Sequence, residues 1–306
     1  MDDLLPDGAL EVVVAPTSHD LGDNFTVRRV LPSRQRRMVG PFVFLDEMGP
    51  HVFAPGKGLD VRPHPHIGLA TVTYLFSGEI LHRDSIGSVQ VIRPGDVNWM
   101  TAGRGIVHSE RTAPDTRLHQ SALAGLQCWV ALPRADEECE PAFTHTGAAA
   151  LPVVQGDGMS ARVVAGSFMG ATSPVQTSSP MFFVDLHLQA GAQAEVAPDY
   201  AERAIYVVEG RLDIGPDGVF DAGQLLVLKP GRSIQVAAAA GPVRAVLLGG
   251  EPMDGPRYLS WNFVSSSAER IEQARQDWRA QKFAKVPGET EFILLPDTPG
   301  KPVHYP

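Results

Sequence analysis

The 306-residue sequence contains only two cysteines, Cys128 and Cys139. Two thiols in a chain of this length cannot form the dense disulfide framework of small secreted proteins. No apolar run approaches the roughly 20 residues that a helix needs to cross a bilayer. Residues 1–4 also lack the basic and apolar segments of a secretory signal. We therefore expect a cytoplasmic protein with no membrane segment, in which Cys128 is a buried small side chain.

Positive charge is also scarce. The chain has 26 Lys and Arg against 35 Asp and Glu, which gives a formal net charge of -9. This balance argues against nucleic acid as an electrostatic partner. The 30 glycines and 26 prolines are generous by comparison and favour many short strands joined by tight turns.

Strand-like runs dominate the sequence and are separated by turn signals such as residues 93–96 and 216–218. This spacing predicts a β-sandwich or β-barrel. The expected strands cover residues 11–15, 25–31, 42–45, 70–76, 88–92, 126–132, 182–188, 204–208, 224–228 and 243–248.

One strong helical segment appears late in the chain. Residues 266–269 (SSAE) fit a capping box in which Ser266 caps the helix. Ile271, Ala274 and Trp278 then follow at helical spacing, and residues 286–288 (VPG) should end the helix. We expect a helix that packs over a sheet.

The chain also repeats itself. Residues 74–78 (YLFSG) resemble residues 206–210 (YVVEG), and residues 94–104 resemble residues 222–232. The loop between the two matching blocks is shorter in the second copy. This pattern predicts a duplicated β-domain.

Chemistry is concentrated in two pairs of residues, His64 with His66 and His108 with Glu110. Within each pair the spacing is two residues, so on a strand both side chains point to the same face. Two such pairs facing one another across a small barrel would gather three imidazoles and one carboxylate. That donor set suits a divalent transition metal such as iron and leaves coordination positions open.

The repeat provides an internal control for these four residues. Their counterparts in the second copy are Val196, Pro198, Val236 and Ala238. If the histidines were needed only to build the strands, the second copy should need them too. We therefore expect one barrel with a metal and one without.

Other polar residues near these pairs allow more than one interpretation. His82 could donate a hydrogen bond to a metal ligand, or could anchor its loop by bonding to Asp84. Gln127 could orient bound water or satisfy a buried carbonyl. The remaining histidines are expected to be structural: His19, His51, His119, His145, His187 and His304.

Four further residues are expected to act mainly in the fold. Asp46 and Glu47 could act as described for Gln127, but they precede the Gly49-Pro50 dipeptide, which favours a place in a turn. Trp99 and Met100 are expected to contribute to the core, with a place in the wall of an aromatic-ligand site as the alternative.

The central block resembles the pirin family of the cupin superfamily. The resemblance rests on residues 62–68 (RPHPHIG), on 71–75 (TVTYL) and on 94–110 (PGDVNWMTAGRGIVHSE), and it spans roughly residues 25 to 285. It continues in residues 40–42, 125–130 and 249–252. One departure is Ala70, where many relatives carry a glutamate; this change does not remove a ligand.

The resemblance implies a mostly β bicupin of two tandem double-stranded β-helix (jelly-roll) barrels. We expect an N-terminal cupin barrel over residues 1–150, and a C-terminal barrel without metal ligands, with a helix and tail, over residues 151–306. The metal ligands of the family carry over onto His64, His66, His108 and Glu110. Fe(II) is the expected metal, with Mn, Ni, Cu, Co and Zn as alternatives.

Some pirins resemble quercetin 2,3-dioxygenases, and others are described as redox-sensitive regulators. The first resemblance implies an oxygenase that acts on a flavonol or related aromatic with dioxygen, with Glu110 as general base. The second implies an iron-binding regulator that docks on a partner protein. A storage or structural cupin is the third alternative. The sequence leans to the oxygenase without deciding between them.

Overall fold

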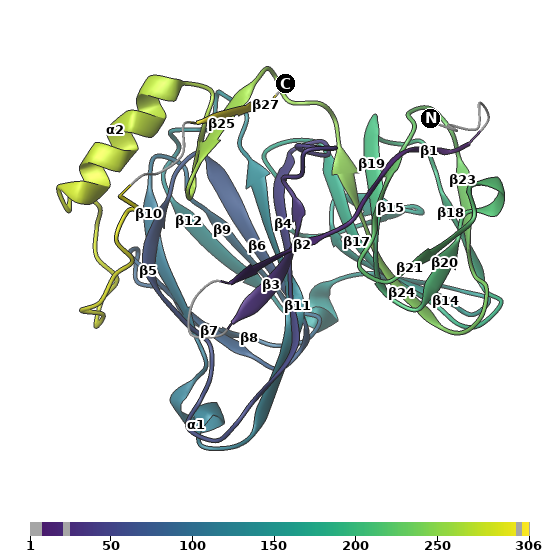
Figure 1. Ribbon diagram of the computed structural model, residues 1–306, viewed down its shortest axis with the longest axis horizontal. Helices are drawn as coiled ribbons and strands as arrows, with labels where there is room; N and C mark the ends of the chain where they lie inside the picture. The colour runs from purple at the N-terminus through teal and green to yellow at the C-terminus, as the bar shows by residue number, and fades with distance from the viewer. Residues whose placement is uncertain (1–7, 21–24, 298–301, 306) are drawn as a thin grey trace. The chain divides into compact units, whose positions relative to one another are not determined.

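The computed structural model describes residues 8–20, 25–297 and 302–305 of the chain. Residues 1–4, for which no secretory signal was expected, lie outside this set. The protein is mostly β and has a cupin-type fold with two domains (Figure 1). Each domain contains a seven-stranded sheet and a four-stranded sheet. Both expectations about fold class are therefore confirmed.

The first compact unit, here called the first barrel, comprises Ser18–Val27, Phe44–Ala148 and Met253–Pro306. Its large sheet has the order β12 (Ala142–Thr146), β9 (Val97–Thr101), β6 (Leu69–Ser77), β11 (Ser121–Ala131), β4 (Phe42–Phe53), β3 (Thr26–Leu31), β2 (Thr17–Asp20). Residues 28–31 of β3 and 42–43 of β4 are counted with the second unit. Its small sheet has the order β5 (Asp60–His66), β10 (Ile106–Arg111), β7 (Ile80–Asp84), β8 (Val89–Ile92). A short helix α1 (Pro114–Arg117) follows β10.

The second compact unit, the second barrel, comprises Met1–Thr17, Arg28–Val43 and Ala149–Pro252. Its large sheet has the order β1 (Leu10–Val14), β22 (Leu225–Leu228), β19 (Glu202–Glu209), β24 (Val243–Gly250), β17 (Met181–Leu188), β14 (Met159–Ala165), β13 (Val153–Gly156). Its small sheet has the order β18 (Gln193–Val196), β23 (Ile234–Ala238), β20 (Arg211–Asp213), β21 (Val219–Asp221). A two-stranded sheet joins β15 (Ser167–Phe168) to β16 (Ala171–Thr172). The chain also forms two short 3-10 helices, η1 (Ala148–Ala150) and η2 (Gly215–Asp217).

The two barrels repeat one topology, which confirms the duplication. In the large sheets, β9-β6-β11-β4 of the first barrel matches β22-β19-β24-β17 of the second. In the small sheets, β5-β10-β7-β8 matches β18-β23-β20-β21. The predicted domain boundary at residue 150 separates the two copies of the repeat along the sequence. It stays a prediction.

A glycine at the end of the repeated strand shows why the sequence match is structural. Gly78 and Gly210 have φ values of 79° and 80°. A Cβ at either position would collide with a main-chain carbonyl, that of Ala122 or that of Pro242. Only glycine tolerates both the positive φ and the close approach of the neighbouring strand.

The late helix α2 (Ala268–Arg279) forms, but its ends differ from those expected. Ser267 is the N-cap and accepts a hydrogen bond from the Arg270 N–H at 3.2 Å. The prediction of Ser266 as the cap is wrong, because its N–H and hydroxyl donate to the distant Glu137 carboxylate. The helix also ends at Arg279, before the predicted stop at residues 286–288.

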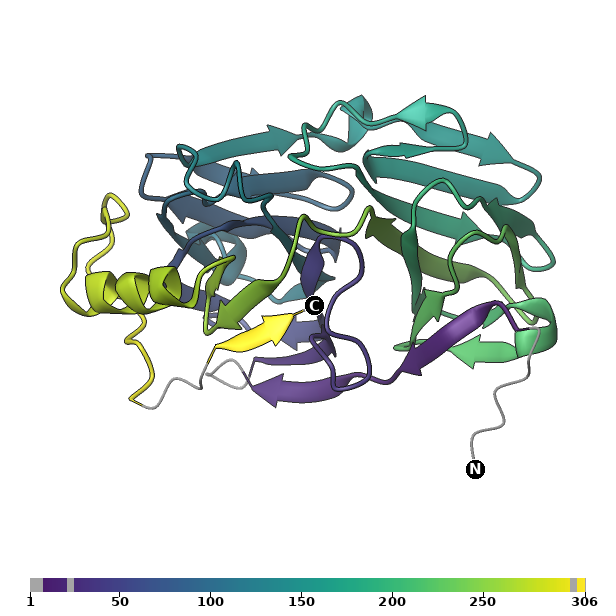
Figure 2. The same ribbon diagram turned by 90° about the horizontal axis from the view of Figure 1, so that it is seen from above.

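The expected inner face of α2 is confirmed. Ile271, Ala274 and Trp278 are buried and pack with Ile67 and Val107 in one apolar cluster. Beside the helix, the chain forms a three-stranded sheet of β26 (Phe263–Ser265), β25 (Arg257–Ser260) and β27 (Val303–Tyr305), visible in Figure 2. The helix therefore covers the first barrel next to the strands that carry the candidate ligands.

The core predictions hold except at one point. Cys128, Trp99 and Met100 are buried, as expected. Asp46 and Glu47, however, do not lie in a turn; both are buried within the continuous strand β4.

Gly49 explains the failure of the turn signal at this point. Its φ of 75° bends β4 where the carbonyl of Leu123 passes against it, and the strand then continues to Phe53.

Among the residues that the structure describes, no helix is long and apolar enough to span a bilayer.

Candidate metal centre

Three of the four predicted ligands converge inside the first barrel. One ring nitrogen from each of His64, His66 and His108 lies within 4.8 Å of the others. The expectation that the two pairs face one another across the barrel is wrong. They lie on the adjacent strands β5 and β10, where His108 is the direct cross-strand partner of His64 and Ile106 that of His66.

Burial sets the charge state of the three rings. All three are buried, with exposed fractions of 7% for His64 and 1% for His66 and His108. Burial lowers the pKa of His64 from 6.5 to about 4. Burial, together with the neighbouring imidazoles, holds the pKa of His66 and His108 well below the ordinary value. At neutral pH these rings are therefore neutral and can offer lone pairs to a cation.

Main-chain carbonyls fix the orientation of two of the rings. Nδ1 of His64 lies 2.9 Å from the Arg62 oxygen, and Nδ1 of His66 lies 3.0 Å from the Asn262 oxygen. Because a carbonyl only accepts, each Nδ1 carries the proton and each Nε2 is left as the electron-pair donor. The Nε2 atoms of His66 and His108 lie 3.1 Å apart.

The fourth predicted ligand, Glu110, is buried in the same barrel but does not join the close group of three nitrogens. Its Oε1 lies 3.4 Å from the hydroxyl of Thr73, which also lies 2.9 Å from Oε1 of Gln127. Burial raises the pKa of the Glu110 carboxyl above its ordinary value. Its roles as ligand and base stay predictions.

His82 is a fourth imidazole beside the cluster. Its Nε2 lies 3.1 Å from Oδ2 of Asp84, which confirms the expected loop-anchoring contact. Its Nδ1 lies 3.5 Å from Nδ1 of His108, and its ring stacks on Phe143 with centroids 4.4 Å apart. Burial alone would raise the pKa of Asp84, but hydrogen bonds from His82 and Ser88 outweigh it and hold that pKa below its usual value.

Three contributors to the site were missed by the sequence reasoning. Thr73 contacts Glu110, Asn262 orients His66, and Phe143 stacks on His82. For Thr73 a signal was available, because Thr71 and Thr73 are polar residues within the mostly apolar strand β6. Asn262 lies 196 residues from His66, and no local pattern links the two.

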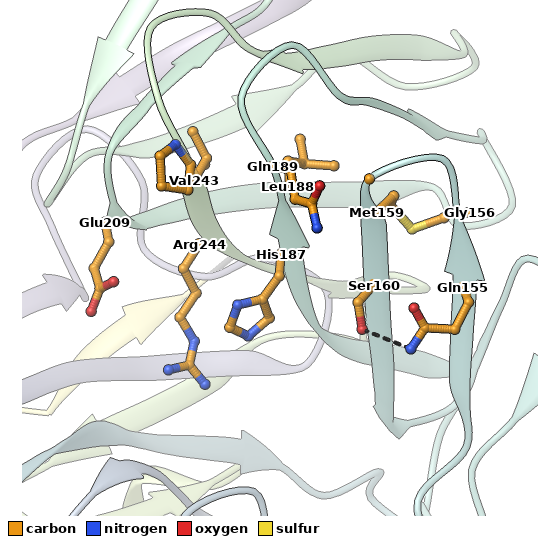
Figure 3. Close-up of a pocket in the computed structure, with 12 residues that line it drawn as sticks. Gln155, Gly156, Met159, Ser160, His187, Leu188, Gln189, Glu209, Val243 and Arg244 are labelled. Atoms are coloured by element: carbon orange, nitrogen blue, oxygen red, sulfur yellow. Dashed lines mark hydrogen bonds between the residues drawn. The ribbon is translucent and has the colours of Figure 1, made fainter.

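The second barrel lacks this chemistry at the corresponding positions. The expected counterparts of His64 and His66, Val196 and Pro198, were placed two residues too far along the chain. Ala194 pairs with Val236 as His64 pairs with His108, and Val196 pairs with Ile234 as His66 pairs with Ile106. The apolar core cluster of this barrel contains Ala194, Val196, Val236 and Ala238, all of them buried. A pocket of about 340 Å³ does open on this barrel and is lined by polar residues that include Ser160, His187, Glu209 and Arg244 (Figure 3). It contains none of the clustered histidines.

The donor set of the first barrel fits a transition metal. Three neutral imidazole nitrogens converge, and a carboxylate lies in the same barrel. Cys128 is a poor additional ligand, because burial and the nearby Asp46 raise the pKa of its thiol. A site of nitrogen and oxygen donors without thiolates suits iron, nickel, copper or manganese. Soft thiolate ligands would favour other metals.

Comparisons with known proteins agree with this picture. A pirin-like protein of Caulobacter vibrioides is 50% identical over 293 residues, which cover 94% of this chain and 100% of that protein. A quercetin 2,3-dioxygenase structure from Acinetobacter baumannii has a TM-score of 0.84 and 37% identity, covering 94% of this chain and 96% of that one. A second quercetin 2,3-dioxygenase structure from that organism has a TM-score of 0.85 and 28% identity, covering 90% and 98%.

Two family models match the chain. The model described as Pirin matches residues 24–130, and the model described as Pirin C-terminal cupin domain matches residues 183–284. With the histidine cluster in the first of these segments and the apolar counterpart in the second, the chain belongs to the pirin family.

Proposed function

We propose that this pirin is a metal-dependent dioxygenase of the quercetin 2,3-dioxygenase type, acting on a flavonol or related aromatic with dioxygen. The observation that carries the proposal is the convergence of the buried side chains of His64, His66 and His108 in a cupin barrel. Support also comes from the solved quercetin 2,3-dioxygenases that this chain resembles over most of its length.

We further propose Fe(II) as the native metal, held by His64, His66, His108 and Glu110. Bound iron would supply Lewis acidity and one-electron chemistry toward dioxygen. The chain's own contribution is a buried set of donors, in which hydrogen bonds to main-chain carbonyl groups fix the orientation of His64 and His66 in advance.

Glu110 is the residue that we assign to proton transfer. A flavonol hydroxyl that approaches the cluster would give its proton to the Glu110 carboxylate. The hydroxyl of Thr73 lies 3.4 Å from Oε1 of that carboxylate and 2.9 Å from Oε1 of Gln127. His64 and Glu110 retain exposed fractions of 7% and 9%, against 1% for His66 and His108, so substrate would enter on their side.

Aerobic turnover of quercetin tests the proposal. Protein loaded separately with iron, manganese, nickel, copper or cobalt is incubated with quercetin, and the loss of flavonol absorbance is followed. We expect consumption of quercetin that requires the metal and is absent in His66→Ala. If none of these metals supports turnover above that of the His66→Ala control, the proposed oxygenase activity is excluded.

The same experiment bears on the second candidate class, a redox-sensitive regulator. If the protein keeps its metal but never consumes a flavonol, affinity capture with the Fe(II) and Fe(III) forms becomes the deciding test. Recovery of a partner protein that depends on the iron state would support that alternative.

A further inference from the structure

The three clustered histidines differ in what fixes their Nδ1 atoms. Main-chain carbonyls accept from Nδ1 of His64 and of His66, which leaves Nε2 of each ring free to bind a cation. Nδ1 of His108 instead lies 3.5 Å from Nδ1 of His82. An imidazole can donate or accept, so this contact does not by itself decide where the His108 proton lies.

Asp84 supplies the missing direction. Its Oδ1 accepts two main-chain N–H groups of the following turn, at 3.0 and 2.9 Å, and its Oδ2 lies 3.1 Å from Nε2 of His82. An ionised carboxylate only accepts hydrogen bonds, so His82 carries its proton on Nε2 and presents a lone pair at Nδ1. That lone pair accepts the Nδ1 proton of His108 and leaves Nε2 of His108 bare.

The opposite arrangement of protons is unfavourable at Asp84. If His108 carried its proton on Nε2, it could donate to Nε2 of His66 across 3.1 Å. With one ring proton, His82 would then have to donate from Nδ1 to His108. Its unprotonated Nε2 would face the Asp84 carboxylate, so two electron-rich atoms would meet in a buried site.

The geometry around His82 holds this chain of hydrogen bonds in place. The cross-strand register sets His82 opposite Glu110 and Asp84 opposite His108. Phe143 stacks on the His82 ring at an interplanar angle of 17°. In the second barrel, the residue opposite Ala238, the counterpart of Glu110, is the buried Leu212. The histidine is thus absent where the ligands are absent.

We propose that Asp84 and His82 are positioning residues, which hold His108 in the tautomer that binds a metal through Nε2. The inference deepens the proposed function, because it concerns the same metal site. It does not require that the metal perform any particular reaction. Metal affinity and proton position test it without reference to turnover.

Asp84→Asn reverses the direction of the hydrogen bonds. The amide oxygen can still accept the two turn N–H groups, so the NH₂ group takes the place of Oδ2 and donates to Nε2 of His82. His82 must then donate from Nδ1, and His108 moves its proton to Nε2, where the metal should bind. We expect the affinity for Ni²⁺, measured by competition with a chelator, to fall about tenfold or more.

Asp185→Asn is the matched control. Asp185 is also a buried aspartate, and its Oδ1 lies 3.3 Å from Nε2 of the histidine two residues away, His187, but it belongs to the second barrel. Its substitution should leave Ni²⁺ affinity unchanged.

The tautomer itself is read from long-range ¹H–¹⁵N spectra of the metal-free protein labelled at histidine. We expect His108 to carry its proton on Nδ1 in the wild type and on Nε2 in Asp84→Asn. A wild-type His108 protonated on Nε2, or an Asp84→Asn affinity within twofold of wild type, would overturn the proposal. If Asp84→Asn does not fold, the wild-type spectrum still decides, and a failure to consume quercetin would leave both readouts intact.

Discussion

Asp185→Asn should destabilise the second barrel through its buried ion pair. The Asp185 carboxylate has an exposed fraction of 3% and accepts two hydrogen bonds from Arg244, at 2.9 and 2.6 Å. Removing one partner of a buried pair costs about 3–5 kcal/mol, because the other charge is left uncompensated. Arg244 keeps an exposed fraction of 15%, so water relieves part of this cost. We therefore expect a loss of about 2–3 kcal/mol in the free energy of unfolding.

The pH dependence of this effect has a defined sign. Burial alone would raise the pKa of Asp185, but hydrogen bonds from His187 and Arg244 outweigh it and hold that pKa well below its ordinary value of 3.8. A depressed pKa in the folded state gives stability that is fully present above the unfolded pKa and is lost as pH falls below it. The difference between wild type and Asp185→Asn should thus be full at neutral pH and shrink below a pH of about 4.

Urea denaturation at neutral and at acidic pH measures this difference. Asp221→Asn is the control, because Asp221 pairs with Arg211 at the surface and its side chain has an exposed fraction of 75%. That variant should change stability by less than about 0.5 kcal/mol. An Asp185→Asn variant as stable as Asp221→Asn at neutral pH would refute the reasoning, as would a difference that grows in acid.

Three further predictions concern the first barrel. His108→Ala should lower bound metal by more than about tenfold while circular dichroism still reports the β-fold; full metal content would contradict its role as ligand. Glu110→Gln should cut quercetin turnover by about 10²–10⁴-fold with a smaller effect on metal content, and equal turnover would exclude Glu110 as the base. Trp278→Ala should cost about 3–5 kcal/mol in unfolding experiments, because the ring has an exposed fraction of 5% and its N–H donates to the Ile293 carbonyl at 3.0 Å. A loss below 1 kcal/mol would show that α2 is not anchored there.

The sequence predicts the fold well because its signals are local and doubled. Alternating strands and glycine turns mark each sheet, and the match of residues 74–78 to 206–210 marks the repeat. The helix cap was misplaced by one residue because Ser266 and Ser267 are equally able to cap. Glu137, which is remote in sequence, selects between them by binding Ser266.

In the candidate site, too, local sequence predicts some features, whereas others depend on tertiary folding. The two-residue spacing predicts that His64 and His66 share one face of a strand, and that His108 shares one with Glu110. The structure brings the three histidines together. Spacing cannot show that their strands are neighbours in one sheet, since that depends on register. The carbonyl of Asn262 illustrates the same limit, because it reaches His66 only through tertiary folding.

The central claim is that one barrel binds a transition metal through the histidine cluster and the other does not. Anomalous diffraction from crystals of the metal-loaded protein tests this claim most directly. We predict one metal peak, within bonding distance of His64, His66 and His108, and no peak inside the second barrel. A metal-loaded crystal without a peak at the three histidines would contradict it.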